Sequence, residues 1–142
     1  MIRAARPADA AAITALLGEL GYPDDVANVH ARLERLEQRA DAEVLVAELD
    51  GRVAAVAAYQ LMDLLERRRP QCRITTLVVG AEDRRSGVAS ALMAKVESIA
   101  RECGCFRLEV TTQTHRQEAA DFYLAFGFHE RPRRLVKPLS SD

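Results

Sequence analysis

One segment of the sequence has residue types and spacing suited to binding an anion. It begins at Gly80, contains Arg84 and Arg85, and reaches Gly87 immediately before a run of residues typical of a helix. The first backbone N–H groups of a helix have no partner within the helix, and the helix dipole adds partial positive charge there. Gly87 has no Cβ, so a ligand can approach its backbone closely, and the arginines can add charge-assisted hydrogen bonds. The segment therefore predicts a phosphate or pyrophosphate site.

The spacing within this segment argues against two common nucleotide sites. A P-loop of the form G-x-x-x-x-G-K-[ST] needs a lysine after its second glycine, where this chain has Val88. The dinucleotide pattern G-x-G-x-x-G does not occur in the segment either. An ordinary strand-to-helix turn, with surface arginines and Ser86 as the helix cap, remains the alternative for the segment taken by itself.

The cysteines and histidines do not form a metal-binding pattern. Cys103 and Cys105 are separated by one residue, the third cysteine is Cys72, and the three histidines are scattered. Structural zinc sites use more widely spaced cysteine pairs with further ligands. We therefore interpret the thiols as small core hydrophobes, interpret His115 and His129 as surface residues, and expect no metal.

The elements before this segment are predicted to be a short strand, two helices and a hairpin. After a strand at residues 2–5, apolar residues recur every three or four positions and predict two amphipathic helices. The first stripe is Ile13, Leu16, Leu17 and Leu20, and the second, which extends to about Ala40, is Val26, Val29, Leu33 and Leu36. Asp50-Gly51 then joins strands at residues 43–49 and 52–60, because this dipeptide readily adopts the positive φ angles of a two-residue turn.

The elements that follow position the segment itself. A β-branched strand at residues 73–79 leads into it, and a helix at 88–103 begins directly after it. A strand at 106–112 and a helix at 117–126 come next, and Phe128 and residues 134–139 are predicted to form closing strands. The order of strands and helices predicts a single α/β domain over residues 1–142.

The composition fits one globular domain and excludes several classes of protein. The chain has 142 residues, 49% of them hydrophobic and 29% charged, and a formal net charge of −1. The near balance of charge argues against a nucleic-acid binder, and no apolar run approaches the roughly 20 residues that cross a bilayer. Since the N-terminus also lacks a secretory apolar segment, we expect a cytoplasmic protein without nucleic-acid or membrane partners.

Three motifs resemble those of the GNAT superfamily of acyl-CoA-dependent N-acyltransferases. Arg84-x-x-Gly87-x-Ala89 resembles the R/Q-x-x-G-x-G/A signature of that family. Downstream, Ala119-x-x-Phe122-Tyr123-x-x-x-Gly127-Phe128 is similar to the family's A-x-x-F-Y-x-x-x-G-F. The opening Ile2-Arg3-x-Ala5-x-x-x-Asp9 is also common in such domains. The resemblance covers nearly the whole chain.

The resemblance implies a fold and a cofactor. The fold is a single GNAT-like domain, a mixed and mostly antiparallel sheet with about four helices and a splayed gap between its fourth and fifth strands. Acetyl-CoA, or another acyl-CoA, would bind as co-substrate with its pantetheine arm in this gap, beside Leu77, Val78 and Val79. Its phosphates would lie on Arg84, Arg85, Ser86, Gly87, Val88, Ala89 and Ser90. An amine would then attack the thioester directly.

Tyr123 has two interpretations. From periodicity alone it is an amphipathic residue at the core boundary, turned roughly 100° from Phe122 on a helix whose apolar stripe also includes Ala119 and Phe126. The resemblance instead implies that it is the acid that protonates the leaving thiolate. A phenol with a pKa near 10 stays protonated at pH 7 and can donate to the sulfur.

The sequence departs from the family pattern at two places. Some members carry a glutamate on the strand before the phosphate loop, but residues 73–77 contain no carboxylate, so the general base is unassigned. A water chain to Glu109, another acid, or an acceptor amine of lower pKa remain the alternatives. Arg116 stands where many members have asparagine, and it either reaches a cofactor phosphate or is a solvated loop residue.

The acceptor is the least defined part of the prediction. The family's acceptor cleft corresponds here to residues 22–25, 59–65 and 129–134. Asp24 and Asp25 fit helix caps better than amine ligands. We expect N-acetylation of a small-molecule amine by a possible homodimer. The alternatives are an acetyltransferase acting on a protein or peptide amine and a non-catalytic acyl-CoA sensor or regulatory module.

Overall fold

The structure is a computed structural model that describes residues 1–112, 117–131 and 134–141. The chain groups into two compact units, Met1–Thr111 and Thr112–Asp142.

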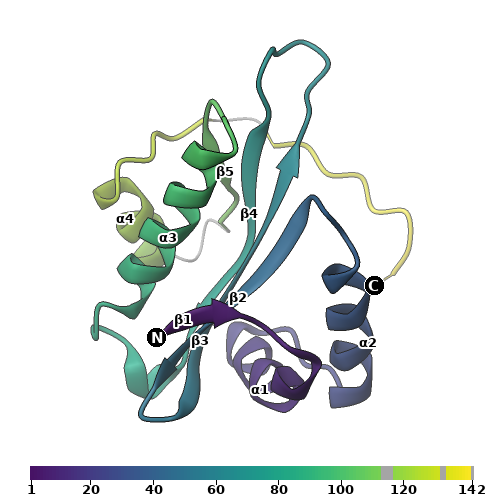
Figure 1. Cartoon of the computed structure of the whole chain (residues 1–142), viewed down its shortest axis with the longest axis vertical. Coiled ribbons are helices and arrows are strands. Elements are labelled where there is room, and N and C mark those ends of the chain that lie inside the picture. The colour runs from purple at the N-terminus through teal and green to yellow at the C-terminus, as the bar shows by residue number, and fades with distance from the viewer. Residues whose placement is uncertain (113–116, 132–133, 142) are drawn as a thin grey trace. The chain divides into compact units, whose positions relative to one another are not determined.

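The first unit is a five-stranded mixed sheet with helices on both of its faces (Figure 1). The strands lie in the order β1 (Ile2–Ala4), β2 (Ala42–Leu49), β3 (Arg52–Met62), β4 (Gln71–Val79) and β5 (Leu108–Val110). β1 to β4 pair antiparallel and β5 is parallel to β4. The helices are α1 (Ala10–Leu20), α2 (Val26–Glu37) and α3 (Val88–Glu102), with single 3-10 turns at Pro7–Asp9 and Ala81–Asp83. This architecture confirms the predicted fold class.

The turn between β2 and β3 explains why the hairpin could be predicted. Asp50 and Gly51 both have positive φ angles, 53° and 76°. This left-handed conformation matches the twist of the flanking strands, which is why short polar residues and glycine are favoured there.

Apolar side chains are buried on both faces of the sheet. On one face a core cluster joins α1 and α2 to the strands through Ala10, Ile13, Leu16, Val29, Leu33, Val46, Val56 and Val78. α3 buries its own stripe, Val88, Leu92, Met93, Val96 and Ala100. Cys72 is fully buried in β4, but Cys103 is exposed, contrary to the prediction, because α3 ends at Glu102.

The opening motif of the sequence has a structural explanation. Arg3 donates two hydrogen bonds to the Asp9 carboxylate, at 2.8 and 2.9 Å, and the backbone N–H of Arg6 donates to the same group at 2.8 Å. Asp9 is buried, and hydrogen bonding to Arg3 holds its pKa below the usual value. The motif therefore ties β1 to the start of α1.

β4 and β5 diverge after a short paired stretch. In the paired stretch, Cys72 lies opposite Leu108, Arg73 opposite Glu109, and Ile74 opposite Val110. On its other side β4 stays paired with β3 as far as Val79. Within residues 1–112, the last five residues of β4 thus have a strand on one side only, which confirms the predicted gap.

The second unit contains α4 (Gln117–Ala125), which is followed by the left-handed Gly127. The predicted closing strands are wrong for the part of this unit that the structure describes, since neither 127–131 nor 134–141 forms a strand. Leu135 and Leu139 are 92% and 94% exposed. The apolar residues Leu135 and Val136 are adjacent, so a strand here would not place its apolar side chains on one face.

Candidate functional site

The loop between β4 and α3 adopts a conformation that leaves the start of α3 open. Arg85 and Gly87 have left-handed φ angles, 64° and 86°, and α3 begins at Val88. Among the described residues, no side chain forms a capping hydrogen bond at this helix start. Ser86, the alternative cap, instead donates its hydroxyl to the Asp83 carbonyl oxygen. The first amides of α3 therefore remain available to an anion.

The space in front of the loop is also open. A Cβ placed on Gly87 would meet no atom within 4 Å. Arg84 and Arg85 are exposed, and neither forms an ion pair or hydrogen bond with another described residue. The predicted residues from Arg84 to Ser90 thus lie together around the uncapped start of α3.

A long-range ion pair anchors this loop to the β2–β3 hairpin. The Arg52 guanidinium donates to both oxygens of the Asp83 carboxylate at 2.7 Å, and Asp83 is only 7% exposed. The Gly80 N–H also donates to the Ala54 carbonyl oxygen at 2.9 Å. Sequence reasoning missed Arg52, because it lies 31 residues from Asp83 and no local pattern relates the two.

We expect Arg52→Ala to lower the midpoint of thermal unfolding more than the double change Arg52→Ala with Asp83→Asn. The single change leaves a buried carboxylate without its partner, and the double change removes that charge. Hydrogen bonding to Arg52 lowers the pKa of Asp83. The pair therefore stabilises the fold above the usual carboxyl pKa, near 3.9, and this contribution is lost as the pH falls through the lowered pKa. Unfolding midpoints from pH 3 to 7 check this, and equal midpoints for both variants would contradict it.

The predicted cofactor strand borders the gap. Leu77 and Val79 are half-buried, whereas the Val78 side chain is buried in the core cluster. Val78 can therefore contact a ligand in the gap only through its backbone. The backbone of this stretch has β3 on one side and no strand on the other within residues 1–112.

The gap closes beside a group of charged residues. Glu109 is paired with Arg73 in the row next to the last β4–β5 pair. Its carboxylate lies 3.9 Å from Arg73 Nε and 3.7 Å from an Arg107 nitrogen, and its side chain is 39% exposed. Glu109 thus places an accessible carboxylate next to the closed end of the gap.

Tyr123 lies in α4 of the second unit, and its burial corrects one expectation. The predicted stripe pointed Phe122 and Phe126 into the core and turned Tyr123 away, but Tyr123 is the buried residue of this helix. Its ring packs edge-on against Phe122 and Phe128, each at a centroid distance of 5.4 Å. Burial raises the pKa of the Tyr123 hydroxyl, so it stays protonated. Arg116 lies outside the described residues.

The aspartates between α1 and α2 are structural. Asp25 accepts a hydrogen bond from the Asn28 N–H at 2.8 Å and caps α2. Asp24 lies 2.7 Å from Arg32, and hydrogen bonds from Asn28 and Arg32 hold its pKa below the usual value. This outcome agrees with the capping interpretation.

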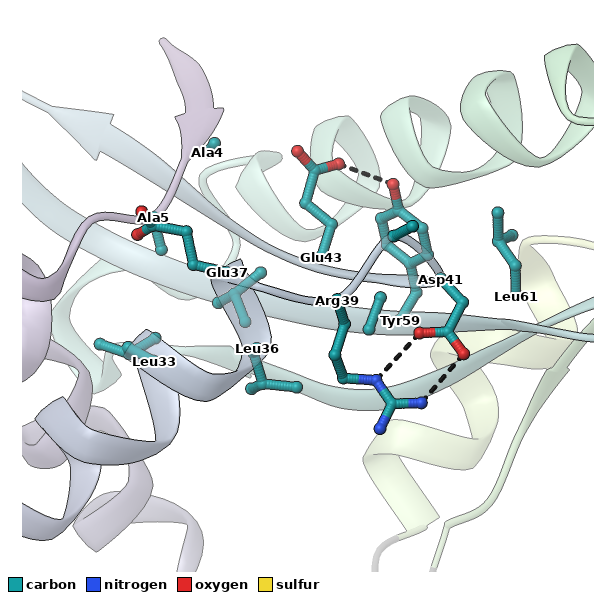
Figure 2. A pocket seen from close by; sticks show the side chains of 13 residues that line it. Ala4, Ala5, Leu33, Leu36, Glu37, Arg39, Asp41, Glu43, Tyr59 and Leu61 are labelled. Atoms are coloured by element: carbon teal, nitrogen blue, oxygen red, sulfur yellow. Dashed lines mark hydrogen bonds and ion pairs between the residues drawn. The ribbon is translucent and has the colours of Figure 1, made fainter.

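A hollow of about 340 Å³ lies elsewhere on the first unit (Figure 2). Most of its lining comes from β1, the end of α2 and the start of β2, and therefore from the sheet edge remote from β5. Four of its polar side chains bond in two pairs: Tyr59 donates to Glu43 at 2.6 Å, and Arg39 pairs with Asp41 at 2.9 Å (Figure 2). The hollow is separate from the β4–β5 gap.

The sequence model of the acetyltransferase (GNAT) family matches residues 11–128. The chain belongs to this family. The match includes residues of both structural units. No curated protein matches the sequence significantly.

Solved structures share the GNAT fold at low sequence identity. A transcriptional regulator from Bacillus halodurans C-125 superposes with a TM-score of 0.89 at 19% identity, covering 98% of this chain and 99% of that one. An aminoglycoside 6'-N-acetyltransferase from Acinetobacter haemolyticus gives 0.84 at 20% identity, covering 100% and 99%. An aminoglycoside N-acetyltransferase in complex with CoA gives 0.85 at 20% identity, covering 97% and 93%. These similarities establish the fold of this GNAT protein.

Two further observations concern the described part of the chain. None of its helices has the length and apolar character needed to cross a membrane. It also contains no group of three or more histidine, cysteine, aspartate or glutamate side chains placed to hold a metal ion.

Proposed function

We propose that this GNAT protein transfers an acetyl group from acetyl-CoA to the primary amine of a small molecule. The observation that carries the proposal is the uncapped start of α3, where Gly87 faces open space beside two arginines that pair with no other described residue. A pyrophosphate there would accept hydrogen bonds from residues Arg84 to Ser90. Two findings support acyl-CoA as the ligand class. The chain belongs to the GNAT family, and one structural neighbour was solved in complex with CoA.

The β4 edge is suited to hold the rest of the co-substrate. Acetyl-CoA supplies the acetyl group as an activated thioester. The backbone of Leu77, Val78 and Val79 would hydrogen-bond the pantetheine arm as a neighbouring strand would, and a strand N–H can polarise the thioester carbonyl. Within residues 1–112 no strand pairs with this edge of β4 beyond Ile74.

Two side chains are assigned to proton transfer in this proposal. A free alkylammonium with a pKa near 10.4 loses its proton at pH 7 at a cost of about 4.6 kcal/mol. Glu109, acting through water, is the base that the geometry favours, because its carboxylate lies beside the closed end of the gap. Tyr123 would hydrogen-bond to the departing sulfur and protonate it, because burial raises the pKa of the phenol and so keeps its proton in place at neutral pH.

One observation favours a non-catalytic acyl-CoA sensor as the second candidate. β4 contains no carboxylate in residues 73–77, where some family members carry a base. Three further points also stay predictions: acetylation of a protein amine as an alternative, a homodimeric state, and a cytoplasmic location.

Ligand-induced stabilisation tests the co-substrate. Acetyl-CoA at 100 times its dissociation constant is expected to stabilise the fold by about 2.7 kcal/mol, and ATP by clearly less at equal concentration. Thermal unfolding with each ligand measures this difference, and thiol release from acetyl-CoA over a panel of amines tests turnover. Equal or larger stabilisation by ATP would overturn the co-substrate. Binding of acetyl-CoA without thiol release would favour the sensor.

A further inference from the structure

We propose that the acceptor of this GNAT protein carries a carboxylate as well as its amine, as an amino acid does, and that Arg73 binds this carboxylate. The inference rests on the proposed acetyl transfer and names the acceptor class of that site. It is carried by a cluster of three arginines at the closed end of the β4–β5 gap, Arg67, Arg73 and Arg107, which we call the arginine cluster.

The arginine cluster is built around Phe106. The guanidinium carbons of Arg67 and Arg107 each lie 4.9 Å from the centroid of the Phe106 ring. Arg107 also donates from Nε to the Gln71 side-chain oxygen at 2.8 Å. These contacts hold two of the three guanidinium groups in place at the surface, so the positive charge there is preorganised.

Arg73 is the member of the cluster whose guanidinium group has neither a ring contact nor a hydrogen bond among the described residues. Its one partner in the described part of the chain is Glu109, at 3.9 Å, which is too long for a hydrogen bond. Its side chain is 36% exposed. A guanidinium group presents paired donors that match the two oxygens of a carboxylate. Arg73 can therefore take an external carboxylate without first breaking a hydrogen bond to any described residue.

The position of Arg73 separates it from the phosphate site. Gly80 lies seven positions after Arg73 along the extended strand, which corresponds to roughly 23 Å. The two arginines of the phosphate loop, Arg84 and Arg85, lie at the far end of that distance. The arginine cluster is thus placed at the acyl end of the gap, where an acceptor must enter.

Arg73 and Glu109 together complement a zwitterion. They are paired across β4 and β5, so they lie side by side on the same face of the sheet. Glu109 would attract the ammonium group of the acceptor, and Arg73 would hold its carboxylate. Two guanidinium groups, those of Arg73 and Arg107, lie within 4 Å of the Glu109 carboxylate, so the site disfavours an acceptor with several positive charges. We therefore expect amino acids to be better acceptors than polyamines or aminoglycosides.

The test compares amino acids with their decarboxylated amines in the wild-type protein and in Arg73→Gln. Suitable pairs are tyrosine with tyramine, lysine with cadaverine, and serine with ethanolamine; O-phosphoethanolamine tests whether phosphate replaces the carboxylate. The measurement is the ratio of kcat/KM for the amino acid to that for its amine. The amino acid and its decarboxylated amine have different amine pKa values, which by themselves affect kcat/KM. This effect is the same for every protein variant, so it cancels when the ratio is compared between variants. The change in the ratio therefore isolates Arg73.

We expect a wild-type ratio above one for at least one pair, and Arg73→Gln to lower that ratio about 10- to 100-fold. Turnover of the plain amine is the reference for this ratio: Arg73 lies 3.9 Å from the proposed base Glu109, and an effect on the base alters both members of a pair and cancels in the ratio. Arg73→Lys is expected to retain part of the preference. Arg68→Gln, which removes an exposed arginine of the β3–β4 loop, is the matched control and should leave the ratio unchanged.

Binding of the same pairs to the CoA-saturated protein, measured by calorimetry, gives a second readout that needs no turnover. The inference would be overturned if both measurements showed a preference for the decarboxylated amines or for O-phosphoethanolamine. It would also be overturned if Arg73→Gln lowered kcat/KM equally for both members of each pair. If acetyl-CoA binds and no amine is acetylated, the proposed transfer fails. The calorimetric comparison then decides the acceptor class by itself.

Discussion

Gly87→Glu is expected to fold and to lose acyl-CoA binding, with an affinity at least about 100-fold lower. The added side chain would enter the open space at the start of α3 and bring negative charge to the proposed pyrophosphate site. Titration with acetyl-CoA by calorimetry measures the loss. An unchanged affinity would show that this loop is only a turn between β4 and α3.

Two variants separate charge from backbone strain in that experiment. Gly87 has a φ of 86°, so any side chain there costs about 1–2 kcal/mol of conformational energy. Gly104→Glu introduces the same side chain at another left-handed glycine, φ 76°, which also faces open space but lies at the opposite end of α3. It is expected to show comparable strain and nearly normal binding. Gly87→Ala, which adds strain without charge, should fall between Gly87→Glu and the wild type.

Tyr123→Phe is expected to lower the rate of acetyl transfer about 10²- to 10⁴-fold while changing stability by no more than about 1 kcal/mol. The substitution keeps the ring that packs against Phe122 and Phe128 and removes only the hydroxyl. Single-turnover kinetics with saturating acetyl-CoA measures the chemical step.

The leaving group provides the control for this role. A more acidic thiol needs less proton donation, so the deficit of Tyr123→Phe should shrink when the acetyl donor carries such a thiol. Phe122→Leu weakens the ring contact and keeps the hydroxyl, and it is expected to reduce stability more than rate. Weaker acyl-CoA binding with normal turnover in Tyr123→Phe would instead assign the residue to packing.

Local patterns in the sequence predicted the parts of the fold that depend on local physics. Asp50-Gly51 fixes the β2–β3 turn through its own φ angles, and the start of α3 follows from Gly87 and the apolar stripe behind it. Non-local features escaped prediction. The Arg52–Asp83 pair joins residues 31 apart, and no spacing rule relates them.

The errors near the C-terminus have a related cause. Helical periodicity gives the angle between Phe122 and Tyr123, but the side that becomes buried depends on packing beyond the helix. Residues 134–139 have strand-forming side chains, yet a strand exists only when a partner satisfies its backbone, and the described residues there have none. Arg73 was passed over because a single arginine on a strand carries no pattern.

The brief pairing of β5 has a consequence for cooperativity. Three register pairs attach this strand to β4, whereas β2, β3 and β4 are joined along most of their lengths. The free energy needed to detach β5 locally is therefore smaller than that needed to unfold the rest of the first unit. A ligand bridging β4 and β5 would raise this local opening energy without altering the core. The gap thus lies between the extensively paired strands β2 to β4 and the weakly attached strand β5. Ligand binding in the gap would therefore reduce the conformational fluctuations of β5.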